Sequence, residues 1–205
     1  MFEKYSIKIL IMFTLNIVYL YKIWYNRNVG GRRMKIIGVT GSSGAGKDTL
    51  CEILENKYNA EIVDADKIAR ELSKKGTMYL QSIVESFGSG IVDRKGELNR
   101  KKLASIIYED DKKREELNKL TFIYVVDEIK KRINKIKKKI IVVNAPLLFE
   151  SNLDQVCDFV IAIIAERKVQ IERIMKRDNR RRSRKKIKYA KYRRLLYRKC
   201  RLYYT

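Results

Sequence analysis

The stretch from residue 35 to residue 58 constrains the fold of this chain more than any other part of it. It begins with the short apolar run KIIGV, continues as the glycine-rich string GSSGAGKDT at residues 41–49, and ends with apolar residues at helical spacing from Leu50 to Tyr58. This order predicts a buried strand, a loop and a helix. A glycine-rich loop between a strand and a helix is the setting in which proteins bind phosphate groups.

The glycine-rich string matches the phosphate-binding pattern G-x-x-x-x-G-K-S/T at all but one position. Gly41 and Gly46 let the backbone curl so that successive N–H groups point at phosphate oxygens, and Lys47 neutralises the β and γ phosphates. The pattern ends in a hydroxyl residue that ligates magnesium, where this chain has Asp48 and then Thr49. We expect ATP as the nucleotide and Mg²⁺ as its metal, held by Asp48 through a water molecule and by Thr49, which also donates to the α phosphate.

The whole loop is therefore predicted to contact the nucleotide. The residues concerned are Gly41, Ser42, Ser43, Gly44, Ala45, Gly46, Lys47, Asp48 and Thr49.

Three further β-branched runs, at residues 60–63, 139–144 and 158–164, predict strands that alternate with helices. Residues 67–135 show mostly helical periodicity. The economical arrangement is an α/β fold, a three-layer α/β/α P-loop kinase with a parallel sheet, in which residues 67–135 form a helical substrate-binding insert.

Two carboxylates follow the second predicted strand. Asp64 and Asp66 flank Ala65 in the string VDADKIAREL, and strand ends beside a P-loop form the crevice in which such sheets bind ligands. An aspartate at a strand end also caps a following helix, here at Lys67. We expect one of the two to cap the helix and the other to take part in chemistry, because a kinase needs a carboxylate that accepts a hydroxyl proton.

The excess of positive charge lies at the two ends of the chain. The net charge is +23, but thirteen of the 47 basic residues lie in residues 180–205, which contain no acidic residue, and six lie in residues 1–33. The middle then holds 28 basic and 23 acidic residues. Such a mild excess suits a kinase of polyanionic substrates, so we expect no nucleic-acid partner for the domain at residues 34–179.

Residues 1–33 are predicted to be foreign to the domain. Their apolar run at residues 7–21 is shorter than the roughly 20 residues that a spanning helix needs, so no stable membrane insertion is expected. The codons of residues 29–33 can contain a ribosome-binding sequence before the codon of Met34. We hypothesise that Met34 is the true start and that residues 1–33 are a translated leader; the alternative is a short hydrophobic extension that tethers the protein to a membrane.

Residues 180–205 change abruptly to a basic and aromatic run. One interpretation is an RNA-binding arm, because interleaved Arg, Lys and Tyr supply phosphate contacts and stacking faces. We favour a frameshift: if this stretch is encoded by AT-rich codons, sliding the frame by one nucleotide would turn residues 180–191 into EEEAEKRLNMQ, which is an ordinary amphipathic helix. The nucleotide sequence from before Met34 to beyond Thr205 tests both terminal hypotheses, and an uninterrupted frame would remove the second.

The cysteines indicate a reducing compartment. Cys51, Cys157 and Cys200 have no C-x-x-C spacing, and the chain contains no histidine to complete a zinc site. We therefore expect a cytoplasmic protein, either a monomer or a small homo-oligomer.

Six motifs in register resemble the dephospho-coenzyme A kinases over nearly all of residues 35–179. They are the P-loop, DADKIAREL at residues 64–72, FGSGIVDRKGELNRKKLASIIYED at residues 87–110, LNKL at residues 117–120, APLLFESNL at residues 145–153 and QIERIMKRD at residues 170–178. The PLLFE string is the most specific of them. The resemblance implies ATP-dependent phosphorylation of the 3′-hydroxyl of dephospho-coenzyme A, the last step of coenzyme A biosynthesis.

The resemblance also implies roles for individual residues. Asp66 would be the general base, acting with Lys47, and Asp64 would orient magnesium or cap the helix. Arg173 and Arg177, four apart on one helical face, would approach the transferring phosphate when a lid closes, and Arg100 would bind the acceptor. For each arginine a solvated charge or an ion pair is the alternative.

The chain departs from the family pattern at several positions. Phe122 and Ile123 stand where the family has His-Pro, and Asn144 stands where it often has an acidic residue. The family's lid helix and final strand, which contact the adenine, are missing after Asn179, which predicts weak or no kinase activity if the tail is frameshifted. The rival functions are another P-loop small-molecule kinase, such as a nucleoside monophosphate kinase, and an RNA-binding protein that uses the basic tail.

Overall fold

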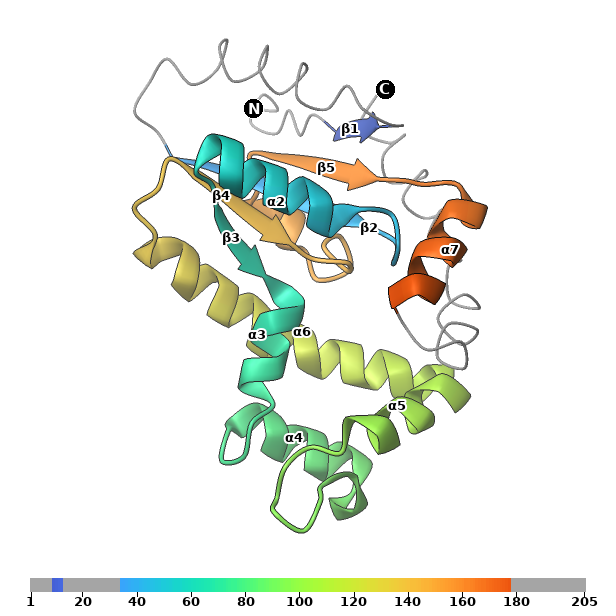
Figure 1. Cartoon of the computed structure of the whole chain (residues 1–205). Helices are drawn as coiled ribbons and strands as arrows, with labels where there is room; N and C mark the ends of the chain where they lie inside the picture. Colours follow the sequence, from blue (N-terminus) through green and yellow to red (C-terminus); the bar gives the residue numbers. More distant parts are fainter. Residues whose placement is uncertain (1–8, 13–33, 178–205) are drawn as a thin grey trace, which may run out of the picture. The chain divides into compact units, whose positions relative to one another are not determined.

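The computed structural model describes residues 9–12 and 34–177. Within these ranges the chain divides into two compact units. The first comprises the described residues up to Val63 and from Ile136 onward, and the second comprises Asp64–Lys135. Figure 1 shows the strands gathered in the first unit together with α2 (Lys47–Tyr58) and α7 (Arg167–Arg177), whereas the second unit is helical.

A five-stranded sheet in the order β1-β5-β2-β4-β3 forms the first unit. β2 pairs in parallel with β4 on one side and with β5 on the other, and β5 also pairs in parallel with β1. The strands are β1 (Ile9–Met12), β2 (Lys35–Gly41), β3 (Glu61–Asp64), β4 (Ile140–Asn144) and β5 (Phe159–Ile163). The α/β class with a parallel sheet, predicted from the β-branched runs, is therefore confirmed.

β2 lies at the centre of the sheet and is buried from Ile37 to Gly41. Ile37 and Val39 are fully buried, and every residue of β4 and β5 is buried as well, as expected for parallel strands covered on both sides. α2 (Lys47–Tyr58) lies across β2 and β4, and its Leu50 and Leu54 pack into the same core (Figure 1). The C-terminal end of β2, where the loop begins, is thus fixed by the best-packed part of the unit.

β1 was not among the strands predicted from the sequence. Its four residues, Ile9–Met12, pair with Val160 to Ile163 on the outer side of β5. They belong to an apolar run that sequence periodicity alone does not separate into strand and non-strand parts. The rest of residues 1–33 and residues 178–205 lie outside the described residues, and the hypotheses on Met34 and on the reading frame after Asn179 stay predictions.

The second unit consists of helices. They are α3 (Ala65–Leu72), α4 (Met78–Phe87), the short 3-10 helix η1 (Ser89–Ile91), α5 (Arg100–Glu109) and α6 (Asp111–Lys135). Polar caps set their starts: Thr77 accepts from the backbone N–H of Leu80, and Asn99 accepts from that of Lys102. Tyr79, Ile83, Ile91 and Leu103 form its core. In the described residues, none of the helices combines the length and the apolar character that crossing a membrane requires.

The thiol of Cys157 is expected to be unreactive in the folded protein. It lies just before β5, is buried, and donates through Sγ to the carbonyl oxygen of Leu153 at 3.2 Å. Burial, together with the nearby Asp154 and Asp158, raises the pKa of its thiol from 9.0 to about 12. Because the thiolate is the reactive form, we expect iodoacetamide at pH 8 to leave Cys157 unmodified in the folded protein and to alkylate it after denaturation.

Peptide mapping by mass spectrometry reports this residue separately from the other two cysteines. Alkylation of Cys157 in the folded protein at the rate of a free thiol would contradict the burial described here.

Candidate functional site: the P-loop and the acidic helix start

The glycine-rich loop is held in its curled form by the end of the sheet. β2 ends at Gly41, and Gly46 is the N-cap of α2, with φ of 108° in the left-handed region. A Cβ atom on Gly41, where φ is 150°, would collide with the carbonyl oxygen of Ile163 in β5. Only glycine lets the two backbones approach so closely, so β5 helps to set the direction in which the loop leaves the sheet.

The loop residues differ in exposure. Gly41 and Ala45 are buried, Ser42, Gly44, Gly46 and Lys47 are half-buried, and Ser43, Asp48 and Thr49 are exposed.

Lys47 lies at the start of α2 and folds back over the loop. Its Nζ donates to the carbonyl oxygen of Gly41 at 2.9 Å and to that of Ser42 at 3.4 Å. The ammonium group is thus held over the curl of the loop by main-chain oxygens. The N-terminus of α2 adds its own positive end beside this cation, which makes this end of the first unit suited to bind phosphate.

Asp48 and Thr49 occupy the first turn of α2, and both are exposed. Carboxylate and hydroxyl oxygens are the hard donors that Mg²⁺ prefers, and an exposed position leaves room for the waters that this ion retains. The donor set therefore fits the metal role predicted for these two residues.

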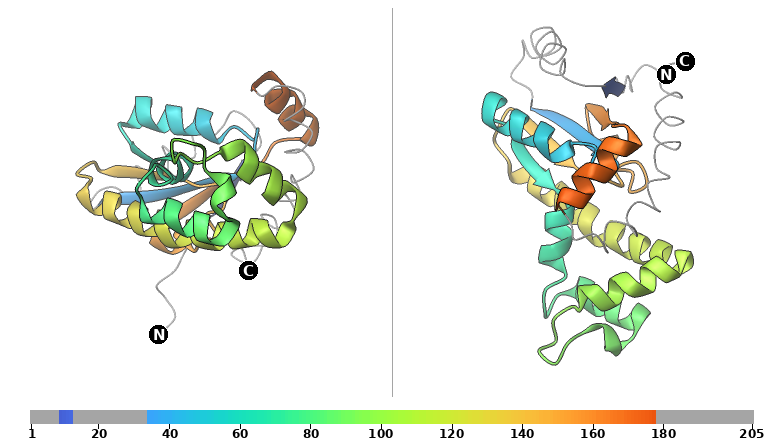
Figure 2. Two further views of the ribbon diagram at one scale, coloured as in Figure 1. Left: turned by 90° about the horizontal axis from the view of Figure 1, so that it is seen from below. Right: turned by 45° about the vertical axis from the view of Figure 1, so that its right-hand side comes forward.

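α7 (Arg167–Arg177) packs its first turns against the loop. Figure 2 shows α7 beside the N-terminal end of α2. Arg173 donates from Nη1 to the carbonyl oxygens of Gly44, at 3.3 Å, and Ala45, at 3.2 Å. The arginine predicted to act on the transferring phosphate thus contacts the P-loop backbone. Arg177 is the last residue of α7, and its side chain lies outside the description.

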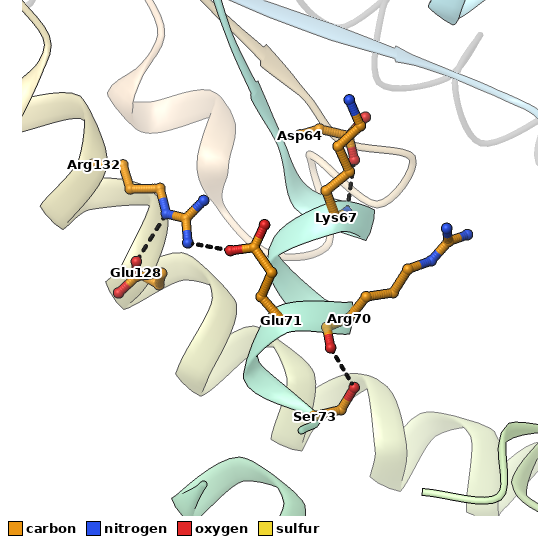
Figure 3. Close-up of polar contacts among 7 residues, drawn as sticks. All are labelled: Asp64, Lys67, Arg70, Glu71, Ser73, Glu128 and Arg132. Carbon is orange, nitrogen blue, oxygen red and sulfur yellow. Dashed lines mark hydrogen bonds and ion pairs between the residues drawn. The ribbon is translucent and has the colours of Figure 1, made fainter. Parts of the chain in front are cut away.

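Asp64 and Asp66 take different places at the start of α3. Asp64 is the N-cap of this helix, and its Oδ1 accepts from the backbone N–H of Lys67 at 2.9 Å (Figure 3). Asp66 lies in the first helical turn and is exposed. Of the two roles that the sequence left open, the capping role therefore belongs to Asp64.

An ion-pair network links α3 to α6 within the helical unit. Arg132 of α6 donates from Nη2 to Glu71 Oε2 at 2.6 Å and from Nε to Glu128 Oε1 at 2.8 Å (Figure 3). Planar guanidinium groups hold two carboxylates in a defined geometry. This contact joins the last turn of α3 to α6 within the helical unit.

Arg100, predicted to bind the acceptor, contacts the other end of α3. Its Nη2 donates to Ser73 Oγ at 2.7 Å and to the carbonyl oxygen of Arg70 at 3.3 Å. A cation at a helix C-terminus satisfies carbonyls that have no partner within the helix. Arg100 thus has a structural role in the helical unit, and the remaining guanidinium donors are the ones on which a binding role depends.

The PLLFE segment follows β4, and its apolar residues are part of the core. Leu148 is fully buried and Phe149 is 4 % exposed. Thr40, in β2, donates from Oγ1 to the carbonyl oxygen of Pro146 at 3.1 Å. This segment therefore supports the strand that carries the P-loop.

The central parallel strand, the curled glycine loop and the lysine folded over it define a P-loop nucleotide-binding fold. The chain is similar to the crystal structure of TT1252 from Thermus thermophilus, with a TM-score of 0.59 and 21 % identity over 71 % of this chain and 73 % of that one, which shows the shared fold. A family model described as dephospho-CoA kinase matches residues 35–192, past the point at which we expect the frame to change.

Curated relatives agree with the family model. A dephospho-CoA kinase of Fusobacterium nucleatum is 39 % identical over 143 residues, covering 70 % of this chain and 73 % of the relative. One of Enterococcus faecalis is 40 % identical over 146 residues, with the same two coverages. This chain belongs to the dephospho-CoA kinase family.

Sequence reasoning singled out the arginines of α7 but not Gln170, which is 5 % exposed and contacts the P-loop. The spacing of Gln170 and Arg173 in the sequence could have pointed to it. Gln170 precedes Arg173 by three residues, so the two lie on the same face of the helix.

Proposed function

We propose that residues 34–179 form the core of an enzyme that transfers the γ-phosphoryl group of ATP, with Mg²⁺, to the 3′-hydroxyl of dephospho-coenzyme A, which gives coenzyme A. The observation that carries the proposal is the P-loop of residues 41–49, with Lys47 over its curl, in a chain of this family. Phosphoryl transfer depends chiefly on positioning and on neutralising charge, so a phosphate-binding loop, a lysine and an acceptor base make a sufficient minimum.

In this proposal the loop backbone and Lys47 bind the phosphates of ATP, and Asp48 and Thr49 hold Mg²⁺, which neutralises charge on the transferring group. Asp66 accepts the proton of the attacking 3′-hydroxyl. Arg173 and Arg177 stabilise charge on the transferring phosphoryl group, and Arg100 and Asp64 contribute to substrate binding. The exposure of Asp66, together with the capping role of Asp64, supports the choice of Asp66 as the base.

A coupled assay that detects ADP tests the proposal. We expect weak transfer or none from the chain with its present residues 180–205, and clear turnover from a chimera in which the C-terminal segment of the Fusobacterium nucleatum relative replaces them. The chimera is offered dephospho-coenzyme A and a panel of nucleoside monophosphates. Activity only on the monophosphates would replace the proposed acceptor, and ordinary turnover by the unaltered chain would contradict the expectation for its tail.

A further inference from the structure

We infer that Gln170 is a positioning residue for nucleotide binding, which fixes Ser42 of the P-loop and ties the loop to the end of β5. Gln170 lies in the second turn of α7 and is 5 % exposed. Its Oε1 accepts from Ser42 Oγ at 3.0 Å, and its Nε2 donates to the carbonyl oxygen of Ala165 at 2.6 Å. One buried amide thus joins two segments that are 128 residues apart in the chain.

The chemistry of the groups fixes the direction of both hydrogen bonds. The carbonyl oxygen of Ala165 can only accept, so the amide nitrogen of Gln170 faces it, and the amide oxygen therefore faces Ser42. An amide oxygen can only accept, so the single hydroxyl proton of Ser42 is given to Gln170. Ser42 then has no hydroxyl proton left for a phosphate oxygen. Its part in phosphate binding is to hold the loop backbone, whose N–H groups make the contact.

The backbone of α7 lies against the loop at the same place. A Cβ atom on Gly44, where φ is +77°, would come 2.8 Å from the carbonyl oxygen of Gln170 and 3.1 Å from Cγ1 of Ile174. Arg173 holds the carbonyl oxygens of Gly44 and Ala45 on this side. The carbonyl group of Ala45 and the N–H of Gly46 belong to one trans peptide, in which the C=O and N–H point in opposite directions. Because the Ala45 oxygen faces Arg173 of α7, the N–H of Gly46 is turned away from α7. Gln170 anchors the first part of the loop, at Ser42, and Arg173 anchors the next part.

The inference rests on the proposed function only in taking ATP as the nucleotide, so its test measures nucleotide binding without an acceptor. The probe is the non-hydrolysable analogue AMP-PNP with magnesium, titrated into the full chain in a calorimeter. We expect Gln170→Met and Ser42→Ala each to weaken AMP-PNP binding about 10-fold. Gln170→Met leaves the hydroxyl of Ser42 and the carbonyl oxygen of Ala165 without this partner, and Ser42→Ala leaves the amide oxygen of Gln170 without its donor. The double variant should be no weaker than Gln170→Met, since both changes remove the same contact. The matched control is Gln155→Met, at an exposed glutamine of the same unit, which should bind like wild type.

Gln170→Glu gives a readout that loss of packing would not produce. Its carboxylate can still accept from Ser42 but cannot donate to Ala165, whereas the protonated acid can do both. We expect the affinity of this variant for AMP-PNP, relative to wild type, to recover as the pH is lowered from 8 to 5. Gln170→Met should show no such recovery.

Three outcomes would overturn the inference. They are wild-type affinity in Ser42→Ala, multiplicative losses of roughly 100-fold in the double variant, and a pH-independent deficit in Gln170→Glu. Ser42→Ala keeps the inference testable even if the Gln170 variants fail to fold. A wild-type chain that binds AMP-PNP while its active chimera ignores dephospho-coenzyme A would defeat the proposed function alone.

Discussion

Replacing Asp66 with asparagine is expected to lower kcat about 10²- to 10⁴-fold, the range typical of a general base. The change keeps the size and polarity of the side chain and removes its ability to take a proton. Asp66 lies in the first, exposed turn of α3 and is not the residue that caps the helix, so the helix should form as before. The rate of a single turnover in the chimera described above, measured by rapid quench, reports the chemical step directly.

The affinity for AMP-PNP is the companion measurement, and it should be unchanged in Asp66→Asn because the base acts on the acceptor. Glu85→Gln serves as the control: it is the same exchange of carboxylate for amide at an exposed position of the helical unit, on α4. It should leave single-turnover rates at the wild-type level. If the single-turnover rate of Asp66→Asn fell by less than threefold, Asp66 would not be the general base.

The sheet could be predicted from the sequence because its strands are short and mostly apolar runs. Residues 35–39, 139–144 and 158–164 are rich in β-branched residues, and each overlaps a strand of the structure. β1 could not be predicted, because four apolar residues inside a longer apolar run carry no periodicity of their own. Its place beside β5 depends on pairing with a strand about 150 residues away, which is tertiary information.

Some residues of the candidate site could be predicted from the sequence and others could not. The loop glycines and Lys47 follow from a local pattern, since the loop and the helix start are contiguous in the sequence. The contacts of α7 with the loop did not follow, because they join residues 128 or 129 positions apart and depend on side-chain direction. Asp64 and Asp66 show an intermediate case: the sequence narrowed the capping role to two residues, and the backbone geometry of α3 selected Asp64.

Replacing Lys47 with methionine is expected to reduce kcat/KM for ATP at least about 10³-fold, because the variant loses the cation that neutralises the β and γ phosphates in the transition state. Methionine retains much of the aliphatic length of the side chain. In the absence of nucleotide the variant loses the contacts of Nζ with the carbonyl oxygens of Gly41 and Ser42. Those contacts are partly exposed, so the free energy of unfolding should fall by only about 0.5–1.5 kcal/mol.

A small change in stability together with a large change in activity would identify the role of Lys47 as electrostatic. Lys57→Met is the matched control, since Lys57 is an exposed lysine in the last turn of the same helix, and its kcat/KM should equal that of wild type. The measurements are urea unfolding of both variants and initial rates in the chimera at several ATP concentrations. If Lys47→Met lost several kcal/mol of stability and its activity fell only in proportion to the unfolded fraction, the lysine would be a structural element of the loop and the proposed phosphate contact would be wrong.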